Sequence, residues 1–133
     1  MSQEGLELAV VGAHLSGQPL NHQLVDLGAA LVATTRTAPH YRLFDLGTTP
    51  PKPGLVRAGD GASGASIEVE LWRLTPAALG AFVDALATPM AIGHLEVADG
   101  RWVAGFVVEP YALAGAREIT DFGGWRAYRA ATR

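Results

Sequence analysis

A turn bounded by two glycines, with a histidine inside it, is the first place in the sequence where chemistry could occur. Residues 12–17 read Gly-Ala-His-Leu-Ser-Gly and follow the apolar residues 8–11. Such a turn after a buried strand presents several backbone N–H groups, and clustered N–H groups bind anions. The alternative is a tight strand-to-loop connection in which His14 is packed and its hydrogen bonds are satisfied. The turn alone leaves both interpretations open.

The spacing of Gly12 and Gly17 is that of a phosphate-binding loop, but the neighbouring residues do not fit a nucleotide. Gln18 and Pro19 stand where that loop needs a lysine and a Ser/Thr hydroxyl. The dinucleotide fingerprint needs a glycine at its third position, where this sequence has His14. We therefore do not expect the turn to bind a nucleotide.

The other side chains that could do chemistry show no recognisable arrangement. The four histidines, at positions 14, 22, 40 and 94, lack the close paired spacing of a helical metal motif, so we expect no metal. The chain has no cysteine, which excludes disulfides, thiolate metal sites and a cysteine nucleophile. Ser16 lies outside a Gly-x-Ser-x-Gly elbow, so a serine triad is not indicated.

Composition predicts a single domain over residues 1–133. Of the 133 residues, 49% are hydrophobic, which is enough for one compact core. The formal net charge of −3 argues against nucleic-acid binding, although nine arginines accompany the one lysine, Lys52. No apolar run is long enough to span a bilayer and no signal-peptide pattern begins the sequence. We therefore expect a cytoplasmic protein without a membrane partner.

Strand patterns dominate the chain. Alternating apolar residues, turn dipeptides and β-branched content predict extended segments at 6–11, at 30–46 with a break at Pro39, at 67–72, and at 94–109 as a hairpin turning at Asp99-Gly100. In segment 67–72, Glu68, Glu70 and Trp72 share one face, which either meets water or lines a polar cavity. Residues 47–66 read as one long irregular stretch, rich in proline and glycine.

Helices are fewer. Thr75-Pro76 is a strong helix start, and the apolar spacing that follows predicts an amphipathic helix ending before Pro89. A short helical segment is expected at residues 20–27, and the aromatic residues of 116–133 predict a docked C-terminal segment. This mixture indicates an α+β fold, built on a small mixed, mainly antiparallel β-barrel with flanking helices.

Five sequence blocks, in order, resemble one known family. They are VVGAHLSGQPLNHQL, TTRTAPHYRLFDL, PPKPGLVR, IEVELW and DFGGWRAY. Together they run from about Leu8 to Tyr128 and resemble the small C-terminal domain of allophanate hydrolase, an enzyme of urea breakdown. That domain is similar in fold to gamma-glutamylcyclotransferases. The resemblance implies a small mixed barrel with helices at its side and a pocket at one end.

The resemblance also implies a role for the glycine-bounded turn. In gamma-glutamylcyclotransferases the loop after the first strand binds carbonyl and carboxylate oxygens of the substrate through backbone N–H groups, and residues 11–15 would occupy that place. The implied ligand is a small carboxylate or carbamate. For the allophanate hydrolase domain, the resemblance implies decarboxylation of N-carboxycarbamate without a cofactor, or alternatively a role in assembly.

Decarboxylation at a nitrogen needs a proton for that nitrogen and donors for two carboxylates. His14 is the expected proton source, because imidazole titrates near neutrality. Loop N–H groups would hold one carboxylate and Arg36 would clamp the other. Solvation of Arg36, and core packing of His40 and Tyr41, are the alternatives. The expected site consists of catalytic His14 and substrate-binding Gly12, Ala13, Leu15, Ser16, Arg36, His40 and Tyr41.

Two other functions remain open. The first is a non-catalytic binding or assembly domain, which joins an amidase partner or forms a homo-oligomer through its hairpin edge and aromatic C-terminal segment. The second is a cyclotransferase-like enzyme. Ala87 and Thr88 stand near the position of that family's acidic residue, so Glu68 or Glu70 would have to replace it. Amide hydrolysis is not expected, because Lys52 has no serine cluster beside it and the Ser-Ser-Lys module of the full hydrolase is missing.

Overall fold

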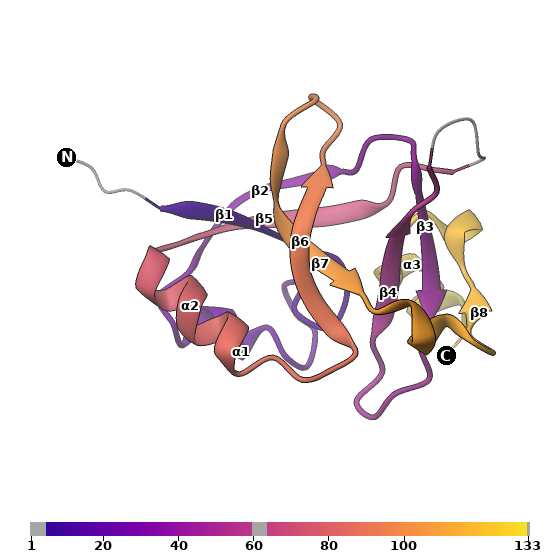
Figure 1. The fold of residues 1–133 in the computed structure, drawn as a ribbon, viewed down its shortest axis with the longest axis horizontal. Coiled ribbons are helices and arrows are strands. Elements are labelled where there is room, and N and C mark those ends of the chain that lie inside the picture. Colours follow the sequence, from indigo (N-terminus) through magenta and orange to yellow (C-terminus); the bar gives the residue numbers. More distant parts are fainter. Residues whose placement is uncertain (1–4, 60–63, 133) are drawn as a thin grey trace.

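The computed structural model describes residues 5–59 and 64–132, which form two β-sheets with short helices beside them (Figure 1). One sheet has five strands in the order β2-β5-β1-β7-β6, and the other has three in the order β4-β3-β8. The strands are β1 (Leu6–Val10), β2 (Ala30–Arg36), β3 (Tyr41–Asp45), β4 (Pro53–Arg57), β5 (Glu68–Leu74), β6 (Met90–Glu96), β7 (Trp102–Val108) and β8 (Arg117–Glu118). The helices are α1 (His22–Val25), α2 (Pro76–Asp84) and α3 (Trp125–Thr132), with 3-10 turns η1 (Pro110–Leu113) and η2 (Thr120–Phe122).

Strand β1 lies in the middle of the five-stranded sheet. It runs antiparallel to β5, with Val10 opposite Glu70, and parallel to β7, with Ala9 opposite Gly105. Leu8, Ala9 and Val10 are fully buried. Because both edges of β1 are paired, the loop that leaves this strand begins inside the molecule and not at its surface.

The five-stranded sheet bends until its two edge strands approach each other at one end. There Thr37 and Val97 form an isolated bridge, and the Ala38 N–H donates to the Glu96 carbonyl at 2.9 Å. Along the rest of β2 and β6 no ladder joins the two edges within the described residues. The predicted α+β class and mainly antiparallel sheet are confirmed, but the barrel does not close, because the chain leaves this sheet after Thr37.

The chain changes sheets at Pro39. The extended pieces predicted on either side of this proline both exist, with β2 at an edge of the first sheet and β3 at the centre of the second. The prediction of an irregular stretch over 47–66 was wrong for β4, which pairs with β3 and tolerates Pro53 as its first residue. Residues 60–63 of that stretch lie outside the described residues.

The predicted hairpin is present as β6 and β7. Its turn is closed by the Val97 N–H, which donates to the Arg101 carbonyl at 2.9 Å, so that three residues, 98–100, lie inside this last hydrogen-bonded pair and not the predicted two. Gly100 has a positive φ of 91°, whereas no non-glycine residue of the described chain does. A single glycine therefore makes the turn, because Asp99 keeps an ordinary backbone conformation.

Helix α2 begins as the sequence predicts. The Thr75 hydroxyl accepts a hydrogen bond from the Ala78 N–H at 3.1 Å, and Pro76 occupies the first helical turn. Phe82 is the buried residue of this helix. Helices α1 and α2 lie next to each other beside the five-stranded sheet (Figure 1). In the part of the chain that the structure describes, no helix is long and apolar enough to cross a bilayer.

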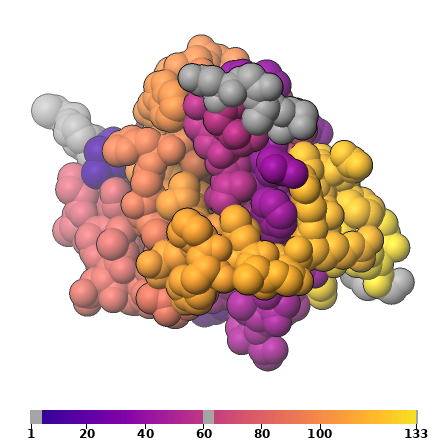
Figure 2. All heavy atoms as spheres, turned by 45° about the vertical axis from the view of Figure 1, so that its right-hand side comes forward, coloured from indigo at the N-terminus to yellow at the C-terminus, as the bar shows by residue number. Residues whose placement is uncertain are grey.

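The C-terminal segment docks against the rest of the protein, as its aromatic residues predict. Trp125 and Tyr128 of α3 are buried, and the Tyr128 hydroxyl bonds to Asp45 of β3 at 2.5 Å. Figure 2 shows the C-terminal residues, in yellow, packed beside the purple strands of the second sheet. At the start of α3, a Cβ added to Gly124 would lie 2.9 Å from Cβ of Glu68, so the helix also approaches β5 closely. Helix α3 thus contacts both sheets.

Candidate functional site

The loop after β1, residues 11–20, is held in one shape by its own contacts; we name it the first loop. Within it, the Leu15 N–H donates to the Gly12 carbonyl at 3.0 Å. The side-chain amide of Asn21 donates to the His14 carbonyl at 2.9 Å. These bonds satisfy carbonyl groups of a largely buried segment, so the first loop needs no ligand to take its conformation.

Three consecutive backbone N–H groups of the first loop have no hydrogen-bond acceptor among the described residues. The N–H groups of Gly12, Ala13 and His14 make no hydrogen bond to any residue in the described part of the chain. All three residues are buried. Because buried N–H groups are rarely left without an acceptor, these three favour a bound anion or water molecule.

Two of the expected amide donors are not available, which corrects the predicted set. The Leu15 N–H is used by the Gly12 carbonyl. The Ser16 N–H donates to Oε1 of Glu70 at 2.8 Å, and the Ser16 hydroxyl donates to the same oxygen at 3.0 Å. The physical reason is that the loop turns after His14, so its later amides point back to acceptors within the protein.

The free amides border a small cavity. Its volume is about 10 Å³, roughly the space of one water molecule. Beside the loop residues, one charged side chain, Lys52, contributes to its wall. We name this space the loop cavity; it is lined by Val11, Gly12, Ala13, His14, Lys52, Pro53, Met90 and Phe106.

His14 is packed, and its ring is not freely exposed. Its side chain packs against the rings of Phe82 and Phe106, with centroid separations of 5.2 and 5.0 Å, and these two rings lie 5.7 Å from each other. The residue is 5% exposed. Nε2 lies 2.7 Å from Oε1 of Gln23. A carboxamide oxygen only accepts hydrogen bonds, so Nε2 carries the hydrogen and Nδ1 of the neutral ring is an acceptor. Of the two interpretations of the turn, the structure shows a packed histidine that also borders the loop cavity.

Burial lowers the pKa of His14, because the imidazolium form loses its hydration inside the protein. The hydrogen bond with Gln23 acts in the opposite direction, and the positive charge of Lys52 lowers the pKa further. The imidazole is therefore mainly neutral near pH 7. An anion in the loop cavity would favour the protonated ring.

Lys52 is the residue of the site that sequence reasoning missed. The sequence placed it in a proline-boxed loop away from any catalytic partner, whereas the structure places it in the wall of the loop cavity beside His14. Pairing of β4 with β3 brings it there, because Lys52 immediately precedes Pro53. One clue was present in the sequence: Lys52, the chain's one lysine, lies in PPKPGLVR, one of the five blocks that resemble the family.

Gly12 is required by the same arrangement. A Cβ added to Gly12 would collide with the ring of Pro53. The glycine therefore serves a close approach of two chain segments, and its φ is not in the left-handed region. This contact closes one side of the loop cavity.

The other expected ligand-binding residues lie elsewhere. Arg36 ends β2, two strands away from β1, and donates to the carbonyls of Ser66 and Gly123, both at 3.2 Å. Tyr41 is buried in the core, where its hydroxyl accepts from the Glu96 N–H at 2.9 Å. His40 precedes β3 and does not line the loop cavity. The structure brings none of the three to His14, because the chain changes sheets between β2 and β3.

No carboxylate lines the loop cavity among the described residues. Glu70 is buried, and its oxygens are occupied by Ser16, Trp72 and Arg126. Glu68 lies 3.4 Å from Arg126. Neither glutamate is therefore placed to act as the acid that a cyclotransferase would need.

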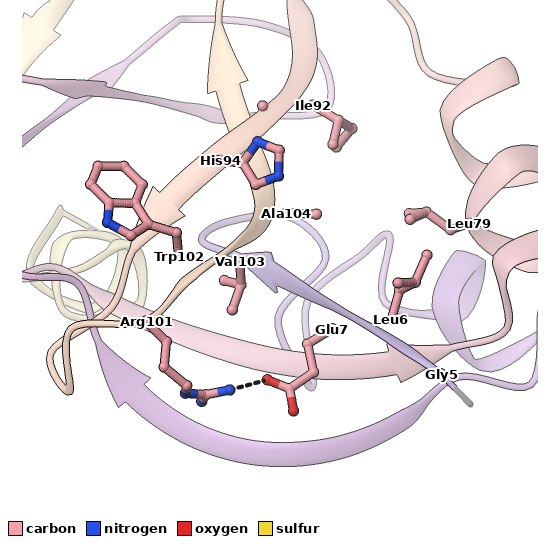
Figure 3. A pocket seen from close by; sticks show the side chains of 11 residues that line it. Gly5, Leu6, Glu7, Leu79, Ile92, His94, Arg101, Trp102, Val103 and Ala104 are labelled. Atoms are coloured by element: carbon pink, nitrogen blue, oxygen red, sulfur yellow. Dashed lines mark hydrogen bonds and ion pairs between the residues drawn. The ribbon is translucent and has the colours of Figure 1, made fainter. Parts of the chain in front are cut away.

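A separate, mainly apolar groove of about 610 Å³ is much larger than the loop cavity (Figure 3). It lies between α2 and strands β1, β6 and β7, and we name it the α2 groove. Leu6, Leu79 and Ile92 point toward it. The charged side chains that line it, Arg101 and Glu7, pair with each other at 3.2 Å. The groove shares no lining residue with the loop cavity. The smaller loop cavity is the better candidate for chemistry.

Comparison with known proteins gives one family. The sequence profile described as "Allophanate hydrolase C-terminal domain" matches residues 6–130. Urea amidolyase of Saccharomyces cerevisiae is 41% identical over 127 residues, covering 92% of this chain and 7% of the yeast protein. The chain thus spans a small fraction of the length of this curated relative.

Solved structures agree with that match. Allophanate hydrolase of Kluyveromyces lactis superposes with a TM-score of 0.93 at 36% identity, over 98% of this chain and 22% of that one. The E. coli protein c4763 superposes with a TM-score of 0.88 at 34% identity, over 96% of this chain and 98% of that one. A likeness in fold alone extends to an AIG2-like protein of Mus musculus, with a TM-score of 0.60 at 19% identity over 80% of this chain and 77% of that one.

Proposed function

Because this chain belongs to the allophanate hydrolase C-terminal domain family, we propose that it binds a small carboxylate- or carbamate-type anion of urea and allophanate breakdown in the loop cavity. The ligand we expect is N-carboxycarbamate, and the reaction is its decarboxylation in the cytoplasm without a cofactor. Whole urea amidolyase and allophanate hydrolase are much longer than this chain, so only this step is assigned to it.

The observation that carries the proposal is that three residues with unpaired amides line the same cavity as one lysine. N–H groups of Gly12, Ala13 and His14 supply partial positive charge, and Lys52 supplies a full one. A dianion with two carboxylates matches both: the amides hold one carboxylate and the ammonium group holds the other. Lys52 thereby takes the role that the sequence gave to Arg36.

Decarboxylation then needs a proton at the substrate nitrogen. The bond from nitrogen to one carboxylate carbon breaks, the electron pair stays on nitrogen, the nitrogen takes a proton, and the carbon leaves as CO2. The bound dianion favours protonation of His14, whose pKa burial otherwise lowers. Nδ1, the ring nitrogen not bonded to Gln23, is the atom that delivers the proton.

Entry of this ligand requires the loop cavity to enlarge, because about 10 Å³ is too small for two carboxylates. Lys52 and Met90 are partly exposed, and both have long, unbranched side chains that change rotamer easily. We expect these two side chains to move outward, while the first loop stays in place.

The test is the rate of CO2 release from freshly generated N-carboxycarbamate. Wild-type protein should accelerate release above the spontaneous rate, and His14→Phe, which keeps an aromatic ring packed against Phe82 and Phe106, should not. The matched control is Arg129→Gln, which changes an arginine stacked on Trp125, away from the loop cavity. Equal rates with and without wild-type protein would rule out the decarboxylase function.

A second candidate function, docking of an amidase, is favoured by the α2 groove. Leu6 and Trp102 of this groove are 45% and 53% exposed, which is high for large apolar side chains. Leu6 begins β1, so in longer relatives that carry this domain at their C-terminal end the preceding polypeptide arrives beside the groove. Sedimentation velocity of this chain mixed with the amidase region of a longer relative would test docking. Trp102→Ser should abolish a complex formed through the groove.

A further inference from the structure

We propose that Glu70 and Arg126 are positioning residues that clamp the first loop and so fix the place of Gly12, Ala13 and His14 in the wall of the loop cavity. The inference rests on the proposed function, because it concerns the same anion site. Neither residue lines the loop cavity, so both act through Ser16.

Glu70 holds the first half of the first loop on both sides. Its backbone pairs with Val10, the last residue of β1, where the loop starts. Its Oε1 accepts from the N–H and the hydroxyl of Ser16, at 2.8 and 3.0 Å, where the loop turns back. Residues 11–15, which include the three free amides, are therefore fixed between two attachments to the same residue.

Arg126 completes the clamp from the other end of the sequence. Its Nη2 donates to Oε2 of Glu70 at 2.8 Å and to the carbonyl of Ser16 at 2.7 Å. Both polar groups of the Ser16 backbone are thus held, the N–H by Glu70 and the carbonyl by Arg126. Ser16 therefore cannot rotate its peptide groups without breaking charge-assisted hydrogen bonds, which are stronger than neutral ones.

The position of Glu70 would suit an apolar residue if stability alone mattered. The residue is 3% exposed and lies in the middle of β5, and the Trp72 indole N–H also donates to it at 3.1 Å. Buried ion pairs often contribute little net stability compared with well-packed apolar side chains, and in some proteins they serve to specify one conformation. Here the geometry that they fix is that of the loop that borders the anion site.

The experiment uses malonate, a stable dicarboxylate, with wild-type protein, Glu70→Gln, Arg126→Gln and Glu68→Gln. Glu68 is the matched control, because it contacts the same arginine at 3.4 Å but does not touch the first loop. Malonate affinity is measured by calorimetry at pH 7, thermal stability is measured separately, and the amide NMR shifts of residues 12–14 are recorded without ligand. Arg126 is 32% exposed, so its variant should fold even if Glu70→Gln does not.

We expect Glu70→Gln and Arg126→Gln to weaken malonate binding about tenfold, the size expected when a buried charge-assisted hydrogen bond is lost. Their amide shifts at residues 12–14 should also move, and Glu68→Gln should match wild type in both. A purely structural role would lower the melting temperature while leaving affinity and amide shifts of the folded variants unchanged, and would overturn the inference.

If wild-type protein does not bind malonate, the proposed function is wrong. The inference that Glu70 and Arg126 clamp the first loop can still hold in that case. The amide shifts then decide the clamp alone. Movement of residues 12–14 in Glu70→Gln and Arg126→Gln, but not in Glu68→Gln, supports it. Unchanged shifts in every variant contradict it.

Discussion

Pro53 packs directly against Gly12, so closely that no side chain fits between them. This contact links the start of β4 to the loop after the central strand. It also brings Lys52 into the wall of the loop cavity, next to His14. The site thus depends on two segments about forty residues apart, and the predictions below follow from that dependence.

Gly12→Ala should destabilise the protein by about 1–3 kcal/mol, because the added methyl group must displace the Pro53 ring. The free energy of unfolding in urea measures this. Gly80→Ala is the matched control: it lies in α2 with no atom near its added Cβ, and helix propensity predicts a stabilisation of up to about 1 kcal/mol. Equal effects of the two substitutions would mean that Pro53 does not pack against Gly12.

Lys52→Met should raise the pKa of His14, because the lysine charge is one of the causes that lower it. The imidazole resonances of His14, followed by NMR against pH without ligand, measure the change. Lys52→Arg keeps the positive charge and should leave the titration close to that of wild type. A His14 titration that is the same in all three proteins would place Lys52 away from the imidazole.

Stability should fall as the pH drops below about 6.5, the ordinary pKa of imidazole. Burial depresses the pKa of His14 in the folded protein, so the unfolded chain takes up the proton first. This contribution to stability is present above pH 6.5 and is lost as the pH falls through the folded pKa. Urea unfolding at pH 7.5 and 5.5 should show the loss in wild type and a smaller loss in His14→Phe.

Glu70 adds a separate effect at lower pH. Burial alone would raise the pKa of its carboxyl, but hydrogen bonds from Arg126, Ser16 and Trp72 lower it below the ordinary value. Its contribution to stability is therefore present above about pH 4.5 and is lost as the pH falls further. Glu70→Gln should remove this acidic phase and leave the phase near pH 6 in place. An unchanged acidic phase would assign it to other carboxylates.

Local patterns were sufficient to predict much of the fold. The Thr75 cap, the hairpin at Gly100 and the glycine-bounded turn after β1 each depend on neighbouring residues, and the structure contains all three. Barrel closure was predicted wrongly, because closure depends on where the chain leaves the sheet. That point is set by pairing between distant strands, which single-sequence periodicity does not report.

The site was predicted only in part, for the same reason. The glycine-bounded turn was found from sequence, but the Leu15 and Ser16 amides expected to bind an anion are bonded within the protein. The place of Arg36 follows from the pairing of β2 with β5, and that of Lys52 from the pairing of β3 with β4. Glu70 and Trp72 were correctly placed on one strand face, which is buried and hydrogen-bonded internally. The hydrogen bond from Ser16 to Glu70 joins residues 54 positions apart, so no pattern of neighbouring residues could predict it.

The most direct test of the anion site is a malonate titration of wild-type protein followed by amide NMR. We expect saturable shifts that are largest at the backbone N–H groups of Gly12, Ala13 and His14. Shifts that do not saturate, or that centre on Trp102 in the α2 groove and leave residues 12–14 unmoved, would contradict anion binding in the loop cavity.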